Sequence, residues 1–200
     1  PDWVARTGEA ERTAAELLPT LDAPRAGLPF LRRRAASQRT AIANYFANRR
    51  LAKKGREDLR PLYFIWTTLR SCNFDCSYCD DHRGQSYPSL PTSGQLDTEQ
   101  GVRLMKVMRT GTSSLYFAGG EPTMRKDLPA LTRAARDLDY YPIIINTNGS
   151  LVDRRLRQTE WRTWLADTDI VVVSLDALDL DELRRMWAYR KPVDVLRNLL

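Results

Sequence analysis

Cysteine and histidine are scarce in this chain of 200 residues, which contains three cysteines and one histidine. An odd cysteine count in a chain of this length argues against the disulfide framework of small secreted proteins. Long hydrophobic runs are missing too, and none approaches the roughly 20 residues that cross a bilayer, so no membrane contact is predicted. We therefore expect reduced thiols in a cytoplasmic protein.

Low-complexity tracts are also missing, and the hydrophobic content of 42% predicts one substantial core. The net charge is +6, and much of the excess lies before residue 61. There, basic pairs and triplets alternate with apolar residues such as Ile42, Tyr45 and Phe46. This spacing predicts an amphipathic helix over 31–55 with a basic outer face, packed on the main domain. Nucleic-acid binding is not expected, because no recognition motif accompanies the charge.

Short apolar segments alternate with helical patterns along the rest of the chain. The strands are predicted at 62–67, 114–118, 143–146 and 170–173, and the helices at 97–111, 128–138, 153–165 and 181–186, with a further helix at 3–18. Strands that are apolar throughout are typical of a parallel sheet buried on both faces. Right-handed crossovers curl such units in one direction. The sequence therefore predicts an α/β fold, a partial parallel (βα)n barrel over 59–200, with a basic helical extension over 1–58.

All three cysteines lie in eight residues directly after the first predicted strand, as Cys72, Cys76 and Cys79. Three thiolates from one short loop can hold a [4Fe-4S] cluster and leave one iron open. Two alternatives remain. With His82, the thiols match the four ligands of a zinc site, which would make the chain a zinc-stabilised basic nucleic-acid-binding module. A four-ligand cluster, completed by His82 or an aspartate, would instead make it an electron-transfer or sensor protein.

Small and polar residues follow the other three predicted strands. They are Gly119, Gly120 and Glu121 after the second, Thr147 and Asn148 after the third, and Ser174 and Asp176 after the fourth. In a β/α barrel the chemistry gathers at the carboxyl ends of the strands, so these loops are predicted to form one site with the cysteines. Glycines allow backbone to approach a ligand. Glu121 either offers a countercharge to an ammonium group or braces its loop, and a plain Asn-Gly turn after the third strand remains open.

The cysteine spacing, with Tyr78 before the last cysteine, and the Gly-Gly-Glu-Pro string at 119–122 resemble the radical S-adenosylmethionine (SAM) superfamily. The resemblance covers about residue 62 to the end. It implies a barrel of about six units, four of which are visible. Because the sequence opens at Pro1 without a methionine and stops in an unfinished helical pattern at 195–200, we expect a fragment that lacks residues at both ends.

The same resemblance implies the cofactors and their contacts. Cys72, Cys76 and Cys79 would hold a [4Fe-4S] cluster, and SAM would contact Tyr78, Gly119, Gly120, Glu121, Thr147, Asn148, Ser174 and Asp176. Reductive cleavage of SAM would give a 5'-deoxyadenosyl radical that takes hydrogen from an unidentified substrate, a cofactor precursor or a peptide. The electron donor would be a protein such as a flavodoxin or ferredoxin. Asn73 and Ser77 are expected to donate hydrogen bonds to the cluster sulfurs.

Overall fold

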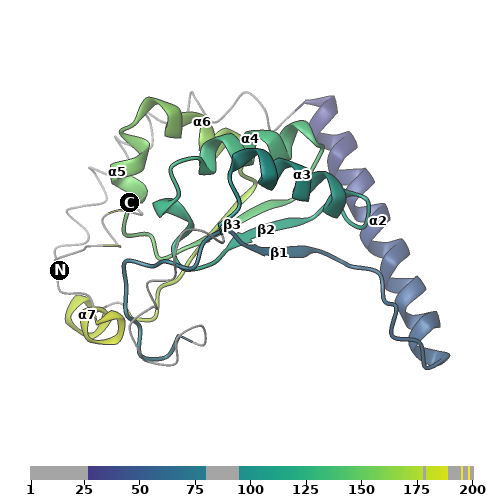
Figure 1. Cartoon of the computed structure of the whole chain (residues 1–200), viewed down its shortest axis with the longest axis horizontal. Helices are drawn as coiled ribbons and strands as arrows, with labels where there is room; N and C mark the ends of the chain where they lie inside the picture. The colour runs from purple at the N-terminus through teal and green to yellow at the C-terminus, as the bar shows by residue number, and fades with distance from the viewer. Residues whose placement is uncertain (1–26, 80–94, 178, 189–194, 196–197, 199–200) are drawn as a thin grey trace.

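The computed structural model describes residues 27–79, 95–177, 179–188, 195 and 198. Its centre is a parallel sheet of four strands in the order β1-β2-β3-β4 (Figure 1). The strands are β1 Phe64–Thr67, β2 Leu115–Ala118, β3 Ile143–Thr147 and β4 Ile170–Val173. The predicted α/β fold and strand positions are confirmed. The predicted helix over 3–18 lies outside the described residues.

One face of the sheet is covered by helices, which Figure 1 shows lying across it. They are α3 Thr98–Arg109, α4 Leu128–Asp137, α5 Val152–Leu156 and α6 Thr159–Asp167. Alternate strand residues point at these helices because successive side chains leave a strand on opposite faces. Leu115 and Phe117 of β2 and Ile143 and Ile145 of β3 are fully buried in this core, as is Trp164 of α6.

Two predictions about these elements are wrong. The segment 153–165 is two helices, because Gln158 adopts an extended backbone and α6 begins anew at Thr159. The second wrong prediction is a sheet buried on both faces, because the described residues cover only the face that packs on the helices. Ile65, Ile170 and Val172 project from the sheet face opposite the helices and are 58%, 45% and 39% exposed.

Helix α2, Leu28–Lys53, lies at the amino ends of the strands, at the opposite end of the sheet from the cysteine loop (Figure 1). The amide nitrogen of Asn44 donates to the carbonyl oxygens of Pro61 and Gly111, at 2.9 and 3.0 Å. Both carbonyls belong to segments that precede strands. The helix is therefore bound to the sheet remote from the predicted site.

The buried side chains of α2 are polar, which overturns the predicted orientation of its apolar residues. Ile42, Tyr45 and Phe46 are about half exposed, whereas Ser37 and Asn44 are buried. The reason is that the amino-end loops present carbonyl groups, which an amide or hydroxyl can satisfy and a hydrocarbon cannot.

No helix among the described residues is both long and apolar enough to cross a membrane. The division of the chain at 58/59 stays a prediction.

Candidate functional site

The loops that leave the four strands are joined in pairs by backbone hydrogen bonds, β1 with β2 and β3 with β4, and the side chain of Glu121 joins the β2 and β3 loops. The N–H groups of Gly120 and Glu121, after β2, each donate at 3.0 Å to the carbonyl oxygens of Leu69 and Ser71, which lead into the cysteines. The Ser174 N–H donates to Thr147 O at 2.9 Å and joins the ends of β3 and β4. The predicted site residues therefore come from loops that meet at one edge of the sheet.

The two glycines after β2 leave room for this backbone contact. Gly119 has φ +130°, and a Cβ atom added there would lie 2.3 Å from the carbonyl oxygen of Leu69. A Cβ atom on Gly120 would lie 2.0 Å from that of Ser71. Neither distance is compatible with a side chain. The glycines are therefore required by the approach of the cysteine loop itself, a role that the sequence analysis did not anticipate.

Glu121 is fully buried and braces the β2 and β3 loops. Its carboxylate accepts the Thr123 N–H at 2.9 Å, the Thr147 hydroxyl at 2.7 Å and the Asn148 N–H at 2.7 Å. The Thr123 hydroxyl donates to the same carboxylate. Burial raises the pKa of Glu121, while these hydrogen bonds oppose that rise. Two roles were predicted for Glu121, a countercharge to an ammonium group and bracing of its loop, and the structure shows the second.

The three cysteines are free thiols of intermediate burial. The sulfur of Cys72 accepts the backbone N–H of Phe74 at 3.4 Å and the side-chain amide of Asn148 at 3.8 Å. Burial raises the pKa of Cys72 to about 11, and Glu121 and the other two thiols add to the rise. Burial also raises the pKa of Cys76. A raised pKa favours the protonated thiol at Cys72 and Cys76, so a bound metal must displace protons there.

Tyr78 and helix α7, Leu180–Trp187, meet at Asp176. The Tyr78 hydroxyl donates to the Asp176 carboxylate, and the Trp187 indole N–H donates to it at 3.0 Å. Burial raises the pKa of Tyr78, and the hydrogen bond to Asp176 adds to the rise. Two residues that the sequence predicted for one site are thus in direct contact.

Helix α7 also packs against the cysteine loop, and this contact was not predicted from the sequence. The ring of Phe74 stacks on Trp187 with centroids 4.8 Å apart, and the Asp75 N–H donates to Trp187 O at 3.0 Å. Phe74, Trp187, Leu183 and Val195 form a second apolar cluster against which Cys72 and Cys76 pack. The spacing of Leu183 and Trp187 four residues apart was the available signal, because such residues share one helix face.

The side chain of Asn73 is hydrogen-bonded within the protein, and its role as a donor to a cluster sulfur stays a prediction. Its amide nitrogen donates to the Ser150 hydroxyl at 2.8 Å, and its oxygen accepts the amide of Asn148 at 3.0 Å. Asn148 is the side chain that reaches the sulfur of Cys72. Ser77 donates its backbone N–H to Met186 O at 3.4 Å, and its role toward a sulfur stays a prediction.

The donors of this loop are three free thiols, the ligand type that holds iron–sulfur clusters. Within the part of the chain that the structure describes, no three Cys, His, Asp or Glu side chains converge on one ion position. The donor set therefore fits a [4Fe-4S] cluster held by three thiolates. His82, the predicted fourth zinc ligand, lies outside the described residues.

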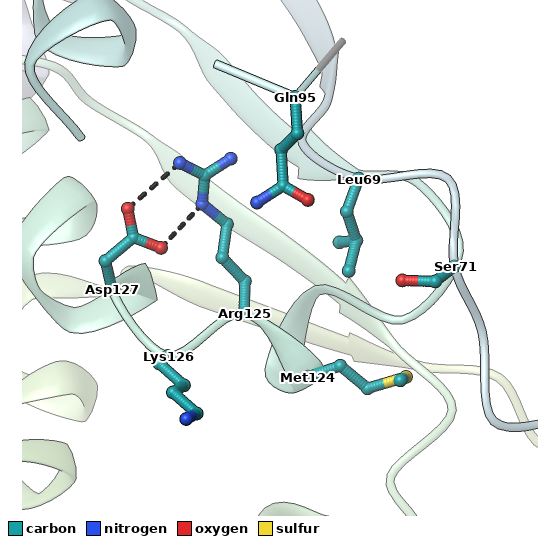
Figure 2. Close-up of a pocket in the computed structure, with 7 residues that line it drawn as sticks. All are labelled: Leu69, Ser71, Gln95, Met124, Arg125, Lys126 and Asp127. Carbon is teal, nitrogen blue, oxygen red and sulfur yellow. Dashed lines mark hydrogen bonds and ion pairs between the residues drawn. The ribbon is translucent and has the colours of Figure 1, made fainter. Parts of the chain in front are cut away.

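A separate pocket of about 360 Å³ opens beside the root of the cysteine loop (Figure 2). Figure 2 shows Arg125 and Asp127 on one wall, joined by hydrogen bonds of 2.7 and 2.9 Å. The other lining residues are Leu69, Ser71, Gln95, Met124 and Lys126. Arg125 and Lys126 make this pocket a poor site for a cation. By contrast, the acidic residues Glu121 and Asp176 lie beside the thiols.

A parallel α/β sheet with a three-thiol loop at the carboxyl ends of its strands defines the class of this protein. The sequence profile of the radical SAM superfamily matches residues 66–200. The chain belongs to this superfamily, whose members use a [4Fe-4S] cluster and SAM, and its sheet is part of a partial barrel.

Curated relatives lie within the same superfamily. The chain is 34% identical over 123 residues to Fe-coproporphyrin III synthase of Methanosarcina barkeri, covering 61% of this chain and 29% of the relative. It is 32% identical over 131 residues to a probable GTP 3',8-cyclase of Saccharolobus solfataricus, covering 64% and 39%. A GTP 3',8-cyclase of Acidothermus cellulolyticus is 34% identical over 142 residues, covering 68% and 38%. The chain thus spans less than half the length of these relatives.

Proposed function

We propose that this chain carries the cofactor site of a radical SAM enzyme, with Cys72, Cys76 and Cys79 as the protein ligands of a [4Fe-4S] cluster. When bound, the cluster supplies one electron to SAM, and cleavage of a carbon–sulfur bond gives the 5'-deoxyadenosyl radical that takes hydrogen from substrate. The observation that carries the proposal is the meeting of three further strand-end loops at one loop of free thiols. In barrels of parallel strands, that edge is where catalysis occurs.

The loops around the thiols would bind SAM. Tyr78, Ser174 and Asp176 offer an aromatic ring and polar groups to the nucleoside and the methionine moiety, and Thr147 lies beside them. Gly119 and Gly120 offer backbone carbonyl groups to the ammonium of SAM. The negative charge of Asp176 favours a sulfonium here. Glu121 is fully buried, and both amide hydrogens of Asn148 are bonded to the cysteine loop, so we assign these two side chains to holding the site in shape.

The substrate is a cofactor precursor or a peptide. The relatives named for GTP and for an iron coproporphyrin support the first of these classes. The electron donor is a small redox protein such as a flavodoxin or ferredoxin, and the compartment is the cytoplasm, where thiols stay reduced.

The test is anaerobic reconstitution with iron and sulfide, followed by metal analysis and by assay of 5'-deoxyadenosine release from SAM under dithionite. About four irons per chain are expected, as in a cubane. Cys76→Ala is expected to lose both cluster and cleavage, whereas Ser77→Ala, in the same loop, keeps the iron. One zinc and no iron would overturn the proposal in favour of the zinc module. Four irons without any cleavage of SAM would favour an electron-transfer protein.

A further inference from the structure

The side-chain amide of Asn148 points at the cysteine loop and not into solvent. Its nitrogen donates to the sulfur of Cys72 at 3.8 Å and to the oxygen of Asn73 at 3.0 Å. An amide nitrogen carries two hydrogens, so these two acceptors use both of them. The amide therefore has no hydrogen left for a nucleoside.

The orientation of this amide is fixed by its surroundings. Its oxygen accepts the backbone N–H of Ser150 at 3.0 Å, and a backbone N–H can only donate. The oxygen must face Ser150, which leaves the nitrogen facing Cys72 and settles the O/N assignment. The Ser150 hydroxyl accepts from Asn73 at 2.8 Å and donates to Asn148 at 2.6 Å, which closes a ring of three side chains.

The backbone of Asn148 is fixed as well. Its N–H donates at 2.7 Å to the buried carboxylate of Glu121, and the turn that follows is held by Asn198, whose amide donates to the carbonyl oxygens of Gly149 and Ser150. A donor that is held at its backbone and at its oxygen does not need to reorient when charge develops on the sulfur, so its dipole acts at full strength.

Building on the proposed function, we propose that Asn148 is a positioning residue that acts through Cys72 and raises the reduction potential of the cluster. Reduction adds an electron to the cluster and negative charge to its sulfurs. An N–H dipole aimed at a sulfur stabilises the reduced form more than the oxidised form. The Phe74 N–H makes the same type of contact to Cys72 at 3.4 Å. The Asn148 amide is the contact that a side-chain substitution can remove.

The experiment compares reconstituted wild type with Asn148→Leu and Ser150→Ala by EPR-monitored potentiometry without SAM. Asn148→Leu removes the donor and is expected to make reduction about threefold to tenfold less favourable, where tenfold corresponds to about 59 mV for one electron. Ser150→Ala changes the same ring of side chains but leaves the amide on Cys72, so its potential is expected to match wild type. Four irons with an unchanged potential in Asn148→Leu would overturn the inference.

A second measurement does not depend on Asn148→Leu. Wild type labelled with ¹⁵N-asparagine is expected to show a ¹⁵N coupling to the reduced cluster by pulsed EPR, and Asn73→Asp, which keeps the acceptor, is expected to retain it. Absence of the coupling in wild type would overturn the inference even if Asn148→Leu fails to fold. Wild type that cleaves SAM but lacks the coupling refutes only the inference. Wild type without a four-iron cluster refutes the proposed function as well.

Discussion

The hydroxyl of Thr147 donates a 2.7 Å hydrogen bond to the carboxylate of Glu121, which joins the ends of β3 and β2 inside the protein. Both residues are buried, and all the hydrogen-bond donors named above for this carboxylate are uncharged. Because burial raises the pKa of Glu121 above the unfolded value, the folded state binds its proton more tightly. Its contribution to stability is therefore fully present at low pH and is lost as pH rises through the folded pKa.

Thr147→Val is expected to lower the free energy of unfolding of the metal-free protein by about 1–3 kcal/mol at pH 8. The loss is expected to be smaller at pH 5, since a protonated carboxyl depends less on donors. Urea denaturation at both pH values measures this. The control is Thr132→Val, a buried threonine whose hydroxyl bonds the Pro129 carbonyl within α4 and no carboxylate. Equal losses for Thr147→Val at the two pH values would contradict the prediction.

Gly120→Ala is expected to destabilise the metal-free protein by about 1–3 kcal/mol or more, because the new Cβ atom would lie 2.0 Å from Ser71 O. Since Ser71 precedes the first cysteine, iron content after reconstitution is expected to fall as well. Denaturation and iron analysis check the two effects. Gly27→Ala is the control, because its Cβ meets Pro29 at an ordinary 3.4 Å. Full iron content in Gly120→Ala would show that the contact can be relaxed.

Asp127→Asn is expected to cost about 1–3 kcal/mol near neutral pH, because it leaves the guanidinium of Arg125, whose side chain is 1% exposed, without its counter-ion. Burial alone raises the pKa of Asp127, but hydrogen bonds from Arg125 and Thr98 outweigh it and hold that pKa below 3.8. The stabilisation is therefore present above pH 3.8 and is lost as pH falls through the folded pKa.

The stability curves of wild type and Asp127→Asn are accordingly expected to converge on acidification, as measured by denaturation between neutral and strongly acidic pH. Asp153→Asn provides the comparison, because its ion pair with Arg157 is exposed and contributes less than about 1 kcal/mol. Parallel curves for wild type and Asp127→Asn down to the lowest pH would refute the assigned pairing.

Trp187→Ala is expected to cost about 3–5 kcal/mol, because it empties the second apolar cluster beside Phe74. Trp187→Phe keeps an aromatic ring on Phe74 but loses the hydrogen bond to Asp176, so a smaller cost of about 1–2 kcal/mol is expected. Thermal denaturation ranks the two variants. Trp187→Ala is also expected to retain less iron after desalting than Trp187→Phe. The opposite order would show that α7 does not stabilise the cysteine loop.

The fold could be predicted from sequence because apolar strands and capped helices are local signals. Asp97 illustrates this: its side chain and that of Gln100 form a reciprocal cap where the helix was predicted to begin. The orientation of α2 could not be predicted in the same way. It depends on carbonyl groups of loops far away in sequence, such as those of Pro61 and Gly111, which decide that Asn44 faces inward.

The candidate site, like the fold, could be predicted from sequence only in part. Cys72, Gly120 and Asp176 could be singled out because their residue types and their positions after strands are visible in sequence. The hydrogen-bonded ring of Asn73, Asn148 and Ser150 could not, since it joins two loops through a register that only the folded sheet sets. Short polar side chains of this kind have no periodicity to read.

The half-exposed strand β4 has a practical consequence for handling the protein. Among the described residues it pairs only with β3, and Ile170, Val171 and Val172 along it are 37–45% exposed. An unprotected row of backbone donors and acceptors flanked by β-branched side chains templates association between molecules. Concentrated samples of this 200-residue polypeptide are therefore expected to associate, and Val172→Lys, on the sheet face opposite the helices, is the substitution expected to keep them clear for spectroscopy.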